Sequence, residues 1–252
     1  MNKEFTILSN KLNKICNKGF IEMKTEKYTN SGLLLEQELG IQSNDFSVAD
    51  IDGIEIKAVN VFTDYPITLF SCTCDGPDVF ELNRLVERFG VRDYIYKDVK
   101  VLYAKLYANE FSNWGKYLKM KLHIDRLEKK IFIIVANRNG KVIEKRAYWN
   151  FDTINSLLER KLNKLCVVYF RRATQDQIKY YNFFKYTFFE YINFDSFLAE
   201  LENGNILVSL KYGVYRNGYK RGTSYNHGTS FSINANRLPH LFLKKSNFEQ
   251  KK

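Results

Sequence analysis

The stretch of residues 32–57, GLLLEQELGIQSNDFSVADIDGIEIK, carries acidic residues in three settings. Glu36 lies in an apolar helical run, Asp50 follows a loop, and Glu55 begins a short β-like run that ends at Lys57. Side chains alternate along a strand, so Glu55 and Lys57 project from the same face. Two neighbouring carboxylates can hold a divalent cation through hard oxygen ligands, and a lysine beside them can orient a water and offset phosphate charge. The stretch therefore predicts metal-dependent phosphodiester cleavage.

The tripeptide Glu-x-Lys is by itself a weak signal, because it occurs five times, starting at residues 22, 55, 128, 159 and 249. In a chain with 27% charged residues, most such matches are expected on solvated faces. Only the match at Glu55 lies among apolar and β-branched residues with an aspartate five positions earlier. Spacing and setting, rather than the tripeptide, single out Glu55 and Lys57.

Length and composition predict a folded protein with a substantial core. The chain has 252 residues, of which 45% are hydrophobic and 15% aromatic, and these values exclude a disordered protein. It is long enough for one large domain or two closely joined lobes. The first residues, MNKEFTILSNKLNKIC, are charged throughout and lack the apolar core of a signal peptide, and no apolar run is long enough to cross a membrane. We therefore expect a soluble, cytoplasmic protein without a membrane partner.

The chain is strongly basic, with a formal net charge of +11 and a pI near 9.3. This balance favours an anionic partner, which can be nucleic acid, an acidic membrane surface or an acidic protein. The charge is concentrated near the C-terminus, where residues 203–248 contain seven Lys or Arg and no Asp or Glu.

Within this basic segment, cations are interleaved with aromatic and small polar residues. Such a mixture can meet phosphates and base edges together, and the candidates for DNA contact are Lys211, Arg216, Lys220, Arg221 and His227. The same composition also fits a basic surface hairpin without a specific partner. Composition alone does not decide between these two interpretations.

Hydrophobic periodicity predicts an α/β or α+β fold, in which a mixed β-sheet is flanked by helices. Helices are expected at residues 3–18, 33–39, 79–90 and 151–165. Strands are expected at residues 54–57, 67–71, 99–106, 118–124, 130–136, 142–149, 166–170, 206–215 and 231–233. Residues 175–201 have a mixed, aromatic-rich pattern that favours neither element.

A collinear series of residues runs along almost the whole chain. It comprises Glu36, Asp50, Glu55-Ile56-Lys57, Tyr148–Asp152, Lys161-Leu162, Tyr180-Tyr181, Glu202-Asn203-Gly204, and residues 222–234 with His227-Gly228-Thr229 and Phe231. In this series the chain resembles the MvaI/BcnI family of type II restriction endonucleases, which is related to the mismatch-repair nickase MutH. No single motif is decisive, but the order and spacing of the series are specific.

The resemblance implies an organisation in two lobes. A PD-(D/E)XK nuclease-like catalytic lobe would occupy residues 1–165, with its core at residues 30–150. A DNA-recognition lobe would follow at residues 166–252, closely joined and without a linker. Family members tend to act as monomers on short, near-palindromic sites in double-stranded DNA.

The resemblance also implies roles for the residues of the opening stretch. Asp50 and Glu55 would bind Mg²⁺ as the cofactor. Lys57 would position or activate the attacking water, and Glu36 would support the metal site from its helix.

The resemblance is weaker in the predicted DNA reader than in the catalytic stretch. Relatives carry Pro where this chain has Ala49, and Asp52 is a second carboxylate nearby, so the assignment of Asp50 rests on spacing. A family member has an Asp-x-Arg pair where this chain has Ser209-Leu210-Lys211, and an arginine where Ser232 stands. Arginine reads guanine in a bidentate geometry that lysine and serine do not reproduce. The recognition sequence of the family is therefore not transferred to this chain.

Residues and resemblance together predict a Mg²⁺-dependent type II restriction endonuclease that hydrolyses specific phosphodiester bonds in double-stranded DNA, leaving a 5′-phosphate and a 3′-hydroxyl. A cognate DNA methyltransferase is expected in the same system, because an unprotected host would be cut. Two alternatives stay open: a MutH-like nickase that cuts one strand, and a non-catalytic DNA-binding protein that kept only the basic segment. The intact Asp50, Glu55 and Lys57 argue against the second alternative.

Overall fold

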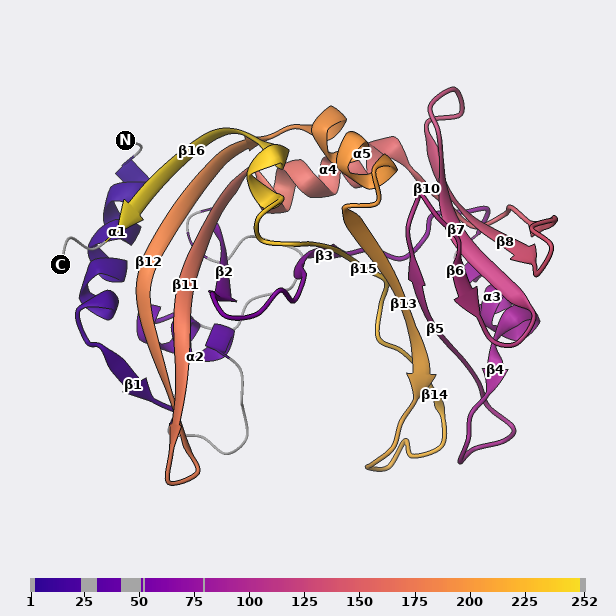
Figure 1. Ribbon diagram of the computed structural model, residues 1–252, viewed down its shortest axis with the longest axis horizontal. Helices are drawn as coiled ribbons and strands as arrows, with labels where there is room; N and C mark the ends of the chain where they lie inside the picture. Colours follow the sequence, from indigo (N-terminus) through magenta and orange to yellow (C-terminus); the bar gives the residue numbers. More distant parts are fainter. Residues whose placement is uncertain (1–2, 24–30, 42–50, 52, 79, 250–252) are drawn as a thin grey trace. The chain divides into compact units, whose positions relative to one another are not determined.

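The computed structural model describes residues 3–23, 31–41, 51, 53–78 and 80–249 (Figure 1). The chain forms two compact units that alternate along the sequence. Unit 1 is built from Met1–Ile67, Leu157–Asn193 and Leu238–Lys252, and unit 2 from Thr68–Ser156 and Phe194–Arg237. Each compact unit draws on separated stretches of the chain, and the two functional lobes expected at residues 1–165 and 166–252 stay a prediction.

Unit 1 contains a five-stranded mixed sheet in the order β1-β12-β11-β2, with β16 also pairing with β12. The strands are β1 (Phe20–Glu22), β2 (Glu55–Asn60), β11 (Lys164–Gln175), β12 (Ile178–Ile192) and β16 (Phe242–Glu249). β11 and β12 form a long antiparallel hairpin, and β2 runs parallel to β11. These pairings join residues from the beginning, the middle and the end of the chain, which is why unit 1 is discontinuous.

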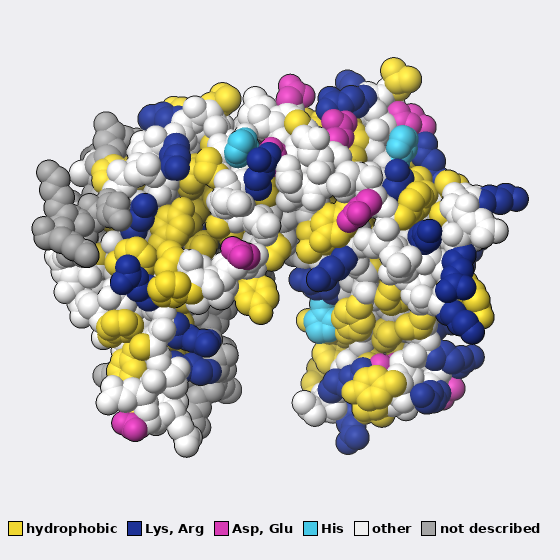
Figure 2. All heavy atoms as spheres, in the orientation of Figure 1, with side chains coloured by type: hydrophobic (Ala, Val, Ile, Leu, Met, Phe, Trp, Pro, Cys, Tyr) yellow, Lys and Arg dark blue, Asp and Glu magenta, His cyan; other side chains and the backbone are white. Residues whose placement is uncertain are grey.

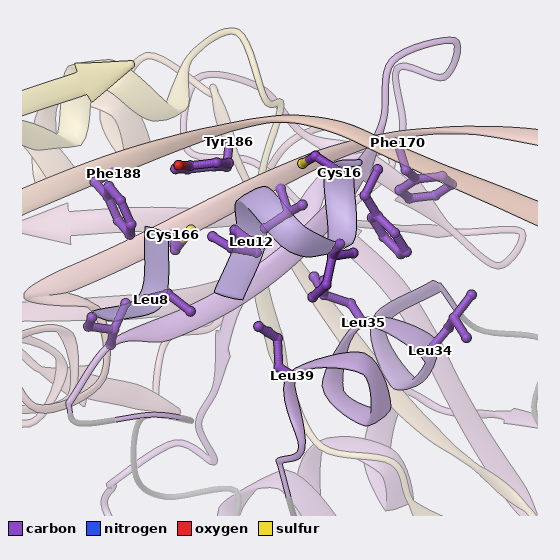
Figure 3. Packing of buried hydrophobic residues seen from close by; sticks show 14 of the residues in the cluster. Leu8, Leu12, Cys16, Leu34, Leu35, Leu39, Cys166, Phe170, Tyr186 and Phe188 are labelled. Atoms are coloured by element: carbon purple, nitrogen blue, oxygen red, sulfur yellow. The ribbon is translucent and has the colours of Figure 1, made fainter. Parts of the chain in front are cut away.

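Two helices, α1 (Lys3–Cys16) and α2 (Ser31–Leu39), pack on one face of this sheet. Apolar residues of α1 recur every three or four positions, so they form one stripe of the helix, and they are buried. They join buried side chains of α2 and the sheet in one apolar cluster (Figure 3), which includes Leu8, Leu12, Leu35, Cys166 and Phe188. Burial of each such side chain contributes roughly 1.5–3 kcal/mol, so this cluster is the main support of unit 1.

Unit 2 is built around two antiparallel sheets. The first has the order β10-β8-β7-β6, with β9 also on β8; its strands are β6 (Ser112–Trp114), β7 (Leu118–Asp125), β8 (Lys130–Asn137), β9 (Val142–Glu144) and β10 (Tyr148–Asn150). The second has the order β3-β15-β13-β5-β4, with β14 on β13; its strands are β3 (Ile67–Ser71), β4 (Val91–Arg92), β5 (Lys100–Leu106), β13 (Ile206–Val214), β14 (Ser224–Asn226) and β15 (Ser230–Ile233).

The core of unit 2 is aromatic. Phe231 stacks on Phe70 with ring centroids 4.7 Å apart and meets Trp149 edge-on at 5.4 Å. The indole N–H of Trp149 donates to the carbonyl of Cys72 at 3.1 Å, so the buried ring leaves no polar atom unsatisfied. The remaining helices are α3 (Glu81–Phe89), α4 (Phe151–Leu162), α5 (Phe194–Glu202) and the 3₁₀ turn η1 (Leu238–Leu241).

The expected fold class, a mixed α+β fold of sheets and helices, is confirmed. The expected strand at residues 142–149 is divided into β9 and β10, which both pair with β8; an irregularity in register, between Val135 and Ala136, lies within the pairing of β8 with β9. The aromatic-rich segment that favoured neither element forms β12 and then α5. Within the described residues, none of the helices combines the length and the apolarity needed to cross a membrane.

Candidate active site

The start of β2 is the centre of the candidate active site. Ile56 and Ala58 pack against the apolar cluster of unit 1. Because side chains alternate along the strand, Glu55 and Lys57 lie on the opposite face of the sheet. The structure thus brings together the two residues of this strand that the sequence singled out.

Glu55 is a buried carboxylate with two ammonium groups close to one of its oxygens. The residue is 5% exposed, and its Oε1 accepts a hydrogen bond from Lys57 Nζ at 2.8 Å. The Nζ of Lys161 lies 3.8 Å from the same oxygen. An ionised carboxylate in this position carries a large desolvation cost unless cations neutralise it. The two lysines provide that neutralisation, and their own side chains are largely buried.

Lys161 was not among the residues that the sequence predicted for the site. It lies in the last turn of α4, where the helix dipole favours a cation. This helix leads directly into β11, the strand that pairs with β2, so the fold delivers Lys161 to Glu55 across a long separation in sequence. The only signal in the sequence was the position of Lys161 in the collinear series, since its spacing from the other site residues is uninformative.

Of the other residues predicted for this site, the structure describes only Glu36. Glu36 lies half-buried on α2, the helix whose Leu34, Leu35 and Leu39 enter the apolar cluster. Asp50, and with it the alternative Asp52, lies outside the described residues.

The described part of the site fits a divalent cation by the chemistry of its donors. A carboxylate oxygen is the ligand that Mg²⁺ prefers, and Glu55 presents one at a buried position. No group of three or more His, Cys, Asp or Glu suited to a metal occurs in the part of the chain that the structure describes. Of the two predicted metal ligands, Asp50 and Glu55, only Glu55 lies within the described residues.

A second polar surface lies on the sheet of unit 2. On β13, Leu210 is buried while Ser209 and Lys211 project from the other face. Residues directly opposite in an antiparallel pair share a face, and Lys211 is opposite Tyr103 and Ser209 opposite Lys105 on β5. One face of this sheet therefore carries two lysines, a serine and a tyrosine; we call this set, Tyr103, Lys105, Ser209 and Lys211, the polar sheet face.

His227 lies beside Lys211, so two of the residues predicted for DNA contact are neighbours. The backbone N–H of His227 donates to the carbonyl of Lys211 at 2.8 Å. The imidazole meets the ring of Tyr225 edge-on, with centroids 3.9 Å apart, and lies 6.5 Å from the ring of Tyr103. These contacts hold the ring next to the polar sheet face.

Arg216 is engaged with a carboxylate of its own unit. Its guanidinium donates two hydrogen bonds to the buried Asp93, at 2.8 and 2.5 Å, and lies 4.8 Å from the ring centroid of Tyr94. The hydrogen bonds from Arg216, together with backbone N–H donors of Tyr96 and Ile95, hold the pKa of Asp93 well below its usual value. The sequence predicted Arg216 for DNA contact, but its donors fasten two loops together.

The two other predicted cations of this loop lie against tyrosines. Arg221 Nε donates to the hydroxyl of Tyr96 at 2.7 Å, and Lys220 Nζ lies 5.7 Å from the ring of Tyr215 and 5.5 Å from that of Tyr219. Figure 2 shows the resulting mixture of dark blue and yellow side chains near β14 and β4. Contacts with tyrosines leave the positive charge of these cations unneutralised.

Comparisons with known proteins agree on one family. The model of the MvaI/BcnI restriction endonuclease family matches residues 9–242. The solved complex of restriction endonuclease MvaI with its cognate DNA substrate is 25% identical, with a TM-score of 0.88, over 98% of this chain and 99% of that chain. MvaI in the absence of DNA is also 25% identical, with a TM-score of 0.63, over 98% of both chains. No curated protein sequence matches the chain.

Proposed function

The chain belongs to the MvaI/BcnI restriction endonuclease family and is a type II site-specific deoxyribonuclease, and we propose that it cleaves both strands of DNA with Mg²⁺ held by Asp50 and Glu55. The observation that carries the assignment of the site is the buried carboxylate of Glu55, hydrogen-bonded to Lys57 on the same strand. A lysine and an acid in this arrangement can serve a phosphate and a water at once.

The reaction is hydrolysis of one phosphodiester bond. Water attacks phosphorus, the bond from phosphorus to the 3′ oxygen breaks, and the proton lost by the water is balanced by the one gained at the 3′-hydroxyl. A bound Mg²⁺ would polarise the phosphoryl oxygens and lower the pKa of a bound water. Lys57 would orient the attacking water and stabilise the charge that develops on the phosphate.

Lys161 and Glu36 have supporting roles in this proposal. Lys161 would be a positioning residue, because its ammonium group lies 3.8 Å from Oε1 of Glu55 and would help to orient that carboxylate. Glu36 would support the metal site from α2. Both act through the ligands rather than on the phosphate.

The polar sheet face of unit 2 would read DNA. Lys211 and His227 are the proposed contacts to base edges, while Lys220 and Arg221 would bind phosphates. Arg216 would act indirectly, by holding the loop of Asp93 against its own loop. Since Ser209 and Lys211 stand where a family member has an acid and an arginine, we propose a recognition sequence that differs from that of the relative.

The biological setting follows from this activity. We propose that the protein works in the cytoplasm, acts as a monomer, and is accompanied by a DNA methyltransferase that protects the same site. The test of the enzyme itself is incubation of the purified protein with unmethylated plasmid and Mg²⁺ beside a Lys57→Ala variant. Discrete linear fragments that the variant does not produce would support the proposal, and sequencing their ends would give the site.

Two other outcomes of that experiment would overturn the proposal. Open circles without linear product would identify a nickase that cuts one strand. Intact plasmid, with a gel shift that still reports binding, would identify a DNA-binding protein without catalysis.

A further inference from the structure

The hairpin of β11 and β12 continues beyond the strand that carries the candidate active site. β2 ends with Asn60 opposite Phe170, while β11 runs on to Gln175 and stays paired with β12. Figure 1 shows the two strands running past the end of β2. The outer part of the hairpin therefore extends the sheet of the active site.

The register places the active-site residues and alternate side chains of this hairpin on the same face of the sheet. Paired residues share a face, and Lys57 is opposite Val167 on β11. Alternation then puts Tyr169 and Arg171 on this face, and Lys185 of β12 joins them because it pairs with Tyr169. The opposite face carries the apolar cluster of unit 1.

The cations of this face are held by aromatic rings. The guanidinium of Arg171 lies 4.6 Å from the ring centroid of Phe184, and Lys185 Nζ lies 5.9 Å from that of Tyr169. Stacking uses the flat face of a guanidinium and leaves the N–H groups at its edge able to donate. Arg171 is exposed, and within the described residues no carboxylate forms an ion pair with it.

The charge of the outer hairpin is unbalanced. Residues 169–187 contain four Lys or Arg and one acid, Asp176 in the turn. Figure 2 shows dark blue side chains along the β11–β12 region in that view. Such a surface favours an anionic ligand, and it is continuous with the face on which Glu55 and Lys57 lie.

We propose that this face of the hairpin, with Arg171 and Lys185 as its donors, binds backbone phosphates next to the phosphate that is cleaved, on the same DNA strand. The inference rests on the proposed function, because it takes the phosphate at Glu55 and Lys57 as the point of reference. Arg171 is four residues along β11 from the level of Lys57, or about 13 Å at ~3.3 Å per residue. One DNA strand carries a phosphate for every ~3.4 Å of helix axis, so the side chain is within a few nucleotides of the cut.

The experiment compares Arg171→Gln with Arg172→Gln in the full chain. Arg172 is the adjacent residue, equally charged and also exposed, but alternation puts it on the other face, so it is a matched control. Binding of a duplex that contains the cleavage site, and of a random duplex, is measured without Mg²⁺ at several salt concentrations. We expect Arg171→Gln to weaken both duplexes roughly tenfold and to reduce the slope of log K against log salt by ~0.9, the value for one phosphate.

Arg172→Gln should leave affinity and slope at the values of the wild-type protein. A slope unchanged in Arg171→Gln, or equal losses in the two variants, would overturn the assignment of this face. Lys185→Gln provides an independent second test if Arg171→Gln lowers the melting temperature. Its affinity and slope should fall as those of Arg171→Gln do, and wild-type values would overturn the assignment.

Failure of this inference can be distinguished from failure of the proposed function. Plasmid cleavage by the wild-type protein tests the function and does not depend on the hairpin. A wild-type protein that binds without cutting would overturn the function, while the comparison of salt slopes would still decide whether this face binds phosphates.

Discussion

Lys161, in the last turn of α4, lies 3.8 Å from the Oε1 of Glu55, the first residue of β2. Two lysines thus share one buried carboxylate oxygen, since Lys57 donates to the same atom. The acid is therefore neutralised by two ammonium groups before any metal binds.

Replacement of Lys161 should show whether this residue positions Glu55 for catalysis or only stabilises the fold. In Lys161→Ala we expect the rate of DNA cleavage to fall roughly tenfold to a hundredfold. The Mg²⁺ concentration for half-maximal activity should fall as well, because one cation fewer opposes the metal at Glu55. Lys161→Arg should keep most of the activity, and Lys164→Ala, which removes a lysine that pairs with Glu4, is the control. A lower melting temperature with an unchanged Mg²⁺ requirement would give Lys161 a structural role alone.

The variant Glu55→Gln keeps the size of the side chain and removes its charge. We expect cleavage to fall at least about a thousandfold, because the metal loses a ligand and Lys57 loses its acceptor. Binding of DNA without Mg²⁺ should be retained or improved, since the variant is more positive. Gel shifts and plasmid cleavage measure the two effects separately. Cleavage close to that of the wild-type protein would remove Glu55 from the site.

Lys211 and Lys220 should affect DNA binding in different ways. Lys211→Ala should reduce discrimination between the cognate site and sites with one base changed by ~1–3 kcal/mol at the position it reads. Lys220→Ala should instead weaken cognate and random duplexes alike, as expected for a phosphate contact. Sequencing of cleavage products from a library of sites, together with binding measurements, checks both effects. Equal loss of discrimination in the two variants would contradict the assignment.

The ion pair of Asp93 and Arg216 predicts a pH-dependent contribution to stability. Because folding lowers the pKa of Asp93, the pair stabilises the protein fully above the unfolded pKa of about 4. That contribution is lost as the pH falls toward the lower folded pKa. Asp93→Asn should therefore lower the melting temperature by a few degrees at pH 7, and the difference from wild type should shrink below about pH 4. A difference that is constant from pH 7 to pH 3 would contradict this account.

The sequence predicted the elements whose periodicity is local. The spacing of apolar residues in the sequence predicted helix α1. The alternation of side chains around Glu55 predicted that Lys57 lies on the same face of the strand as Glu55, and the two residues are in contact. The sequence did not predict a site role for Lys161, because its contact with Glu55 depends on the pairing of β2 with β11, and no local sequence pattern reveals that pairing. The role of Asp50 stays a prediction.

The sequence pattern did not predict the hairpin of β11 and β12, for two reasons. A bulge interrupts the alternation near Phe184, where Phe170 pairs with Phe183 and Tyr169 with Lys185. The turn also lacks a glycine, although Asp176 and Gln177 have φ angles of 50° and 66°, a conformation that usually favours Gly or Asn. The ion pair of Arg216 with Asp93 was not visible in the sequence for a similar reason, since the two residues are remote in sequence, and the role of Arg216 toward DNA stays a prediction.

The alternation of the two units along the chain has a consequence for biosynthesis. β2 pairs with β11, so residue 55 meets residue 165, and the same sheet takes its last strand from residues 242–249. Among the described strands β2 pairs only with β11, so during translation this neighbour becomes available only after residues 68–156 of unit 2 have been made. A chain that stops before residue 164 cannot form this sheet at all. We therefore expect truncated or nascent chains to be harmless to the host chromosome, with cutting activity arising only in the finished polypeptide.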